Sequence, residues 1–132
     1  MAIAVTLTTT PKPRPDESDL GFGRFFSDHM FVMDWEVSRG WFDPRIVPYG
    51  PFSLDPAAGV LHYGQAMFEG LKAFKRTDGT HALFRPQRHA ERMAHGAPRL
   101  CMPAPDGELF IEGAKALVRA DRDWVQIGRA HV

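Results

Sequence analysis

An Asp-Gly pair at positions 78–79 constrains the fold of this chain more than any other sequence feature. It separates two short segments that could form the arms of a hairpin, residues 71–75 and 82–84, and Asp-Gly favours the tight turn that joins two antiparallel strands. Pro86 follows closely and suits the first turn of a helix. Upstream, apolar residues recur at helical spacing over residues 60–70, which predicts a short amphipathic helix that stops at a glycine. One segment is therefore predicted to supply a helix, a hairpin and the start of another helix.

Two extended runs nearer the N-terminus predict a further hairpin. Residues 28–37 alternate in side-chain type and are rich in aromatic residues, and residues 41–49 form a second run after a turn. Pro44 and Pro48 lack the amide donor of a strand ladder, so we expect them at an edge or a bend. Together the two runs predict an antiparallel pair.

Helical spacing organises the C-terminal half of the chain. The helix that begins at Pro86 is expected to weaken or end at Gly96 and Pro98. Its predicted apolar stripe comprises Ala90, Met93, Ala94 and Ala97. A third helix is predicted from the N-cap Asp106 to about Asp121. The fold class is therefore α+β, a small domain with antiparallel sheet or hairpins and about three helices.

The two ends of the chain differ in composition from the domain predicted at residues 20–125. Residues 1–19 are rich in Thr and Pro, and we expect a mobile or extended lead-in that holds neither a strand ladder nor a helix. Residues 126–132 have no periodicity and resemble the translation of a sequencing-adapter oligonucleotide. We therefore expect a non-native tail there, and a native protein that diverges after Val125.

Charge and cysteine content narrow the possible functions. The 16 basic and 16 acidic residues balance, whereas a nucleic-acid or anionic-membrane surface needs a basic excess. No apolar run approaches the length of a membrane span, and the first residues lack the features of a signal peptide. We therefore expect no nucleic acid and no membrane as a partner. The single cysteine, Cys101, cannot form an internal disulfide, which favours a reducing compartment, with the cytoplasm as the default.

General catalytic motifs are scarce. There is no P-loop, no Rossmann glycine motif, no His-Glu-x-x-His and no Cys-x-x-Cys. The six histidines are scattered, so no metal site is expected. Ser27, Asp28 and His29 are the residue types of a catalytic triad, but neighbours on a strand point to opposite faces, and we interpret them as structural. Taken residue by residue, the sequence predicts an α+β domain without a defined activity.

A series of short motifs adds to this reading. The most specific are Leu-His-Tyr at 61–63 and Phe-Glu-Gly-Leu-Lys-Ala-Phe at 68–74. The others lie at residues 22–23, 26–30, 48–51, 54–56, 84–86, 92–93, 99–100 and 123–125. In this order, over residues 22–125, they resemble the N-terminal domain of a branched-chain-amino-acid aminotransferase, a pyridoxal-phosphate enzyme of fold type IV.

The resemblance implies a two-domain enzyme with pyridoxal 5′-phosphate held between its domains. By position, Arg92 would bind the cofactor phosphate, a role that suits a planar guanidinium with a permanent charge. Phe22, Tyr63 and Phe68 match residues that line the family's pocket for a branched aliphatic side chain. One departure is His89, where the family usually has asparagine. Without the family, Arg92 would be interpreted as a solvated helix residue and Phe68 as core packing.

The implied reaction moves the amino group of Leu, Ile or Val to 2-oxoglutarate, giving a branched 2-oxo acid and glutamate. Tyr63 would reach the site of a neighbouring subunit, which implies a homodimer. The family's cofactor-bonding lysine lies beyond Val125, and Lys72, Lys75 and Lys115 do not correspond to it, so this chain is expected to be inactive alone. Two alternatives are a D-amino-acid aminotransferase or lyase relative of the same fold type, and a non-catalytic interaction domain.

Overall fold

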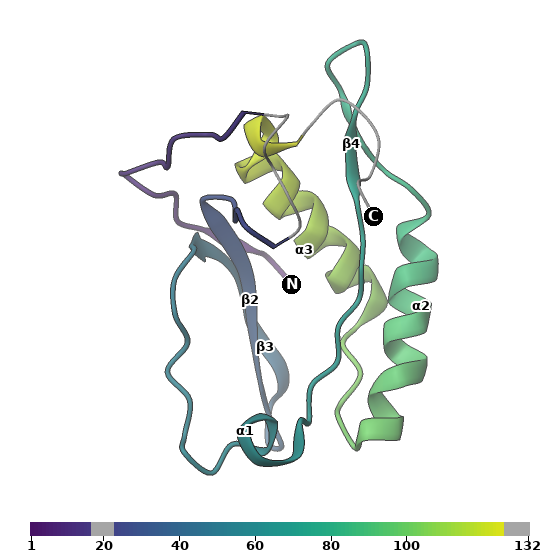
Figure 1. The fold of residues 1–132 in the computed structure, drawn as a ribbon. Coiled ribbons are helices and arrows are strands. Elements are labelled where there is room, and N and C mark those ends of the chain that lie inside the picture. Colours follow the sequence, from purple (N-terminus) through teal and green to yellow (C-terminus); the bar gives the residue numbers. More distant parts are fainter. Residues whose placement is uncertain (17–22, 126–132) are drawn as a thin grey trace.

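The computed structural model describes residues 1–16 and 23–125 (Figure 1). Within these residues two separate sheets and three α-helices form, which confirms the predicted α+β class. Helix α3 (Gly107–Ala120) runs through the middle of the molecule. It packs against strands β2 and β3 on one side and against helix α2 (Pro86–Gly96) on the other (Figure 1).

The first predicted hairpin is confirmed. Strand β2 (His29–Glu36) pairs antiparallel with β3 (Gly40–Pro48). Midway along the pair the register shifts, because β3 has one extra residue there, and Asp43 takes a φ of 52°. This bulge accommodates the buried Pro44. Pro44 was expected at an edge or a bend because it lacks an amide donor, and the bulge is such a bend.

The N-terminal lead-in takes part in the sheet, so the expectation that it holds no ladder is wrong. Strand β1 (Ala4–Val5) pairs in parallel with Arg45 and Ile46, which makes β3 the central strand. The prolines behind that expectation begin only at Pro11, so residues 4 and 5 keep the amide donors that a ladder needs. Residues 17–19 of the lead-in lie outside the described residues.

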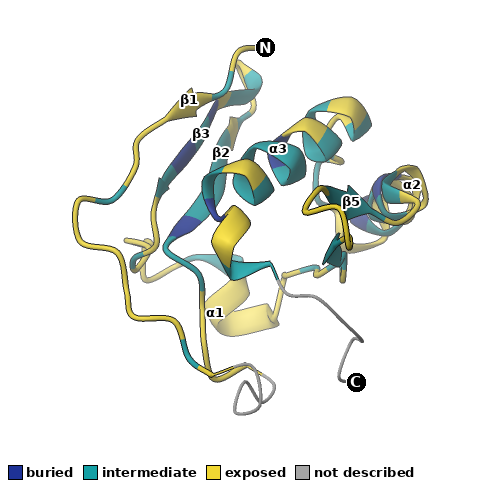
Figure 2. Ribbon diagram, turned by 90° about the horizontal axis from the view of Figure 1, so that it is seen from above, coloured by how far each residue is buried: buried dark blue, intermediate teal, exposed yellow. Residues whose placement is uncertain are grey.

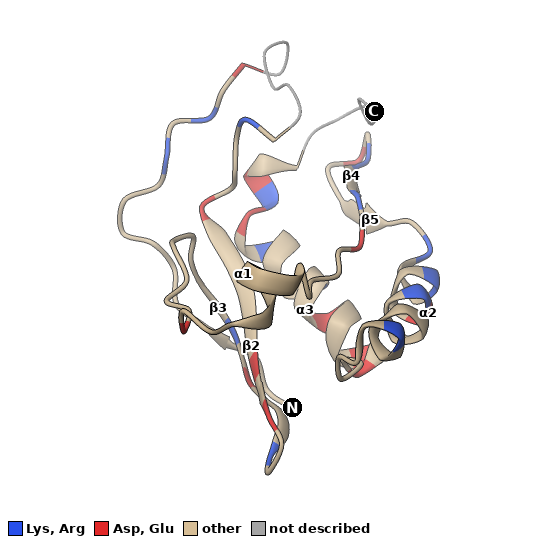
Figure 3. Ribbon diagram, turned by 60° about the horizontal axis from the view of Figure 1, so that its bottom comes forward, with Lys and Arg blue, Asp and Glu red and all other residues tan. Residues whose placement is uncertain are grey.

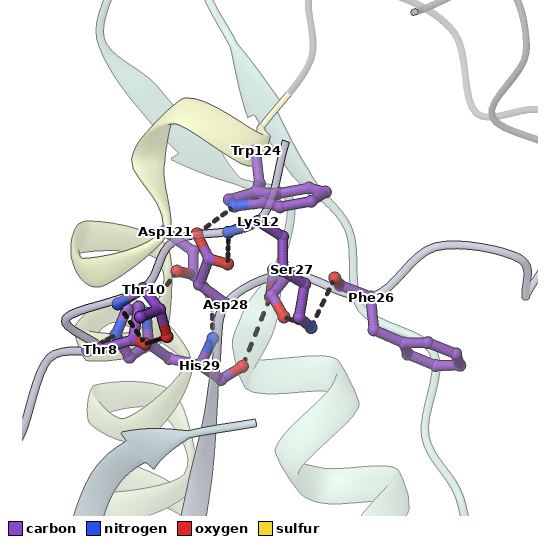
Figure 4. Close-up of polar contacts among 9 residues, drawn as sticks. All are labelled: Thr8, Thr10, Lys12, Phe26, Ser27, Asp28, His29, Asp121 and Trp124. Carbon is purple, nitrogen blue, oxygen red and sulfur yellow. Dashed lines mark hydrogen bonds and ion pairs between the residues drawn. The ribbon is translucent and has the colours of Figure 1, made fainter. Parts of the chain in front are cut away.

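A buried pair, His29 and Asp121, joins the start of β2 to the end of α3 (Figure 4). Both residues are 6% exposed, and Nδ1 of His29 lies 2.6 Å from Oδ1 of Asp121. The second carboxylate oxygen accepts the backbone N–H of His29 at 3.0 Å. The amide of Thr8 donates to Nε2 at 2.8 Å, so Nε2 is unprotonated and Nδ1 carries the proton that Asp121 accepts.

Asp28 makes a second link between the same parts of the chain. Its carboxylate accepts the indole N–H of Trp124 at 3.0 Å and the backbone N–H of Lys12 at 2.8 Å (Figure 4). Burial opposes ionisation of this carboxyl, but the hydrogen bonds from Lys12 and Trp124 outweigh it and lower the pKa of Asp28. Asp28 and His29 therefore bond to different partners, in agreement with a structural role for both.

The helix predicted over residues 60–70 is much shorter than expected. Helix α1 (Gly59–Tyr63) has five residues, and Gly64 closes it with a φ of 59° while its amide donates to the carbonyl of Gly59. Glycine adopts this left-handed conformation without a side-chain clash, which makes it a common C-cap. Residues 65–72 that follow have no regular secondary structure.

The second predicted hairpin is confirmed. Strand β4 (Ala73–Lys75) pairs antiparallel with β5 (His81–Leu83), and Gly79 in the turn has a φ of 82°. The hairpin lies next to α2 and does not join the first sheet (Figures 1 and 2).

Helix α2 begins at Pro86 and ends at Gly96, as the proline and glycine positions predicted, and the short 3₁₀ helix η2 (Ala97–Leu100) follows it. Ala90 and Ala97 of the predicted apolar stripe are buried. Ala94 is exposed, so its place in that stripe was predicted wrongly. At this position the 3.6-residue period turns the side chain away from α3.

Helix α3 begins at the predicted N-cap, where the carboxylate of Asp106 accepts the amide of Leu109 at 2.8 Å. A Cβ added at Gly113 would lie 2.8 Å from the ring of Phe31. The missing side chain therefore lets the ring from β2 pack directly against the helix. The 3₁₀ helix η3 (Arg122–Trp124) completes the described chain.

Few side chains are fully enclosed. Ile46 is the largest fully buried side chain among the described residues, whereas many large apolar side chains are exposed. Figure 2 shows the buried residues on β3, α3 and α2, and shows α1 exposed. In the described part of the chain, no helix has the length and apolar character needed to cross a membrane.

Replacing Asp121 with alanine is expected to destabilise the fold by about 2–4 kcal/mol, because two buried N–H groups of His29 lose their acceptors. Urea unfolding followed by circular dichroism measures the change. Asp123→Ala is the matched control, since its side chain is 64% exposed and its ion pair with Arg14 lies at the surface. Equal losses of stability in the two variants would contradict the role assigned to the buried pair.

Candidate functional site

Glu69 is the buried centre of a cluster formed by the segment after α1 and by helix α2. Its side chain is only 3% exposed, although no helix or strand holds it. Nδ1 of His89 lies 2.7 Å from Oε1 of Glu69, and Nε of Arg92 donates to Oε2 at 2.6 Å. Nη2 of Arg92 donates to Oε1, so the guanidinium and the carboxylate meet at two points.

The sequence places both basic partners on one face of α2. His89 and Arg92 are three positions apart, and residues at this spacing are neighbours on a helix surface. Gly96 lies further along the helix, and a Cβ added there would be 2.8 Å from the sulfur of Met67. Met67 therefore packs closely on Gly96, where a larger residue would force the methionine side chain to shift, and this contact helps to hold the irregular segment that carries Glu69 against α2.

The cluster fixes the charge of Glu69. The hydrogen bond from Arg92 lowers the pKa of Glu69 to about 2; burial opposes this shift, and the hydrogen bond from His89 adds to it. An ionised carboxylate only accepts hydrogen bonds, so Nδ1 of His89 carries a proton. Glu69 therefore orients Arg92 and His89 and does not donate a proton at neutral pH.

Arg92 is held on one edge and open on the other. Nε and Nη2 contact Glu69, yet the side chain is 69% exposed, and Nη1 has no hydrogen-bond partner among residues 1–16 and 23–125. The hydrogen bond to Glu69 raises the pKa of Arg92, so its charge is permanent. A guanidinium oriented by a buried carboxylate and open to solvent can bind an oxyanion such as a phosphate.

The aromatic residues singled out by the sequence lie at the surface. Tyr63 ends α1 and Phe68 directly precedes Glu69, and they are 89% and 95% exposed. The alternative interpretation of Phe68 as core packing is therefore wrong. Phe22 lies outside the described residues. The exposed rings are available for contacts with protein beyond those residues.

Sequence reasoning named Arg92 but missed the residues that hold it. Glu69 received no role beyond its place in the 68–74 motif, and His89 was noted only as a departure from the family. One sequence signal could have indicated these partners. Glu69 is the single acidic residue in the otherwise apolar segment 66–71, and a carboxylate that becomes buried with such a segment needs a cationic partner. Which cation it meets depends on how the segment packs on α2, and the sequence pattern does not specify that.

The chain is similar over most of its length to curated branched-chain-amino-acid aminotransferases. Branched-chain-amino-acid aminotransferase 2 of Bacillus subtilis (strain 168) is 54% identical over 123 residues, which are 93% of this chain and 34% of that protein. Branched-chain-amino-acid transaminase 1 of the same strain is 51% identical over 114 residues, or 86% and 32%. A probable branched-chain-amino-acid aminotransferase of Streptomyces coelicolor is 51% identical over 105 residues, or 80% and 29%. No protein-family model matches the chain.

The chain is similar to the N-terminal third of these branched-chain-amino-acid aminotransferases. It spans about a third of the length of the curated relatives it matches. The resemblance predicted from the short motifs is thus confirmed.

Glu69 is expected to make stability depend on pH. Its folded-state pKa of about 2 lies below the ordinary value of 4.5, so the stabilisation is complete above pH 4.5 and disappears as the pH falls toward 2. Glu69→Gln should remove this dependence and cost about 1–2 kcal/mol at pH 7, a value reduced because solvent screens the exposed Arg92.

Urea unfolding between pH 7 and pH 2 measures this dependence. Glu91→Gln is the control, because Glu91 pairs with Arg88 at the surface of the same helix. Identical pH profiles for the unmodified chain and Glu69→Gln would show that the cluster does not hold an ionised carboxylate.

Proposed function

We propose that this chain is the N-terminal part of an enzyme that transfers the amino group of leucine, isoleucine or valine to 2-oxoglutarate. The observation that carries the proposal is the Glu69–Arg92 pair, in which a buried carboxylate orients a guanidinium whose outer edge is open. The substrate class is supported by the relatives, which are named as branched-chain-amino-acid aminotransferases.

Pyridoxal 5′-phosphate is the cofactor that we propose, and the residues present fit its phosphate. Arg92 would hold the phosphate through Nη1, the edge that Glu69 leaves open. Glu69 would keep the guanidinium plane fixed, so that little side-chain freedom is lost when the phosphate binds. When bound, the cofactor supplies the electron sink that amino transfer needs.

Phe22, Tyr63 and Phe68 are proposed to form an apolar wall of the substrate pocket. Tyr63 and Phe68 are almost fully exposed in this chain. Exposed apolar surface often marks a site where other protein binds, so their exposure supports contacts with a second domain and a second subunit. We therefore propose a homodimer. Such a wall favours branched aliphatic over polar substrates by desolvation, but separates leucine, isoleucine and valine only weakly.

The complete reaction requires residues that this chain does not supply. We propose that the lysine that bonds to the cofactor lies beyond Val125. The proposal agrees with the comparisons, because the chain matches only about a third of the length of its relatives. The chain alone is then inactive. The proposed location is the cytoplasm, where the exposed Cys101 would stay reduced.

The complete protein is expected to convert L-leucine, L-isoleucine and L-valine with 2-oxoglutarate, with rates that differ by less than about a hundredfold. A coupled assay of glutamate measures the reaction, with L-aspartate as the polar control substrate. The chain of residues 1–125 should give no glutamate. Conversion of D-alanine in place of the branched L-amino acids would overturn the proposal in favour of a D-amino-acid aminotransferase.

Arg92→Gln in the complete protein is expected to weaken pyridoxal-phosphate binding at least tenfold, since a charge-assisted contact to the phosphate is lost. The effect on cofactor affinity should be far larger than the effect on the Tm of the apo form. Titration followed by cofactor absorbance measures the affinity. Arg88→Gln on the same helix is the matched control, because Arg88 pairs with Glu91. An unchanged cofactor affinity in Arg92→Gln would refute the phosphate assignment.

A further inference from the structure

A groove of about 850 Å³ separates the second hairpin from the C-terminal half of α3. Strand β5 and the start of α2 form one wall, and the last turns of α3 together with η3 form the other. Leu83 and Val118 contribute apolar surface to opposite walls. Glu69, His89 and Arg92 do not line this groove, so it is separate from the cluster described above.

The groove is strongly cationic. Among its lining residues that the structure describes, four are basic and none is acidic; the basic ones are Arg85, Lys115, Arg119 and Arg122. Figure 3 shows Lys and Arg on α2 and toward the C-terminal end of α3. Lys115 pairs with Glu112 on its own helix at 2.6 Å, but within the described residues the three arginines make no ion pair. An anion in the groove would relieve their mutual repulsion.

The start of α2 is a further feature of the groove that matches an oxyanion. Helix α2 begins there without a side-chain cap, so the positive end of its dipole faces the groove. Nε2 of His81 is buried and has no hydrogen-bond partner in the described part of the structure. The ring of His81 lines the groove, but Nε2 itself is enclosed by protein atoms and is not open to a ligand there.

We propose that this groove binds a small organic phosphate, meaning a phosphate monoester with an apolar body. Guanidinium forks and the N-terminus of a helix both favour phosphate oxygens. The volume is in the range of small-molecule sites and exceeds what an inorganic phosphate ion needs, while Leu83 and Val118 provide surface for an apolar body. The site stands independently of the proposed amino transfer.

Phenyl phosphate is the probe that tests the proposal. Calorimetric titration of the chain should show binding that is tighter than that of inorganic phosphate and that weakens as sodium chloride is added. In nitrogen-15 NMR spectra, the imidazole signal of His81 should shift on binding. The double variant Arg119→Gln/Arg122→Gln should bind phenyl phosphate at least about tenfold more weakly, because charge-assisted contacts are lost.

The matched control is Arg88→Gln/Arg99→Gln, which removes two charges outside the groove and should leave the affinity unchanged. Arg92→Gln should also retain binding, which separates this site from the proposed cofactor site. Equal weakening in the two double variants would overturn the proposal, and so would full affinity in Arg119→Gln/Arg122→Gln or an unshifted His81 signal. Because no cofactor or amino donor is present, the outcome does not depend on whether the aminotransferase assay succeeds.

Discussion

The buried hydrogen bond between His29 and Asp121 connects parts of the chain that are far apart in sequence. His29 starts β2, Asp121 follows α3, and the amide of Thr8 in the N-terminal segment donates to the same imidazole. Because His29 and Asp121 are buried, losing the bonds between them leaves polar atoms unsatisfied. The sheet, α3 and the N-terminal segment are thereby fixed relative to one another. Helix α3 in turn carries α2, and with it the Glu69 cluster.

That cluster is built on a segment without regular secondary structure. Gly64 ends α1 early, and the chain then crosses to α2, where Met67 packs at Gly96 and Glu69 meets Arg92. A buried carboxylate in an irregular segment is stable only because its charge is neutralised at hydrogen-bond distance. The same neutralisation fixes the orientation of Arg92 and leaves one edge of it open. The position of Arg92 therefore follows from a few packing constraints.

Most secondary structure could be predicted from local sequence. The Asp78–Gly79 turn, the proline that starts α2 and the Asp106 N-cap are each specified by backbone chemistry within a few residues. The errors concern choices that local sequence leaves open. Gly64 fits both an apolar helix position and a C-cap, and Ala4–Val5 has no pattern that indicates a parallel partner 41 positions away at Arg45 and Ile46. The exposure of Ala94 and Phe68 likewise depends on which elements pack against them.

The sequence by itself determined the resemblance to the aminotransferase family, the α+β class, the two hairpins and the choice of Arg92 as the candidate phosphate ligand, because turn geometry, helix ends and short motifs are encoded locally. Only the tertiary structure decided that Glu69 holds Arg92, that His29 pairs with Asp121, and that three arginines without an ion pair to the described residues share a groove with His81. The physical reason is that charge pairing and burial depend on distances between elements. Those distances are set by packing across the whole domain and not by the spacing of residues along the chain.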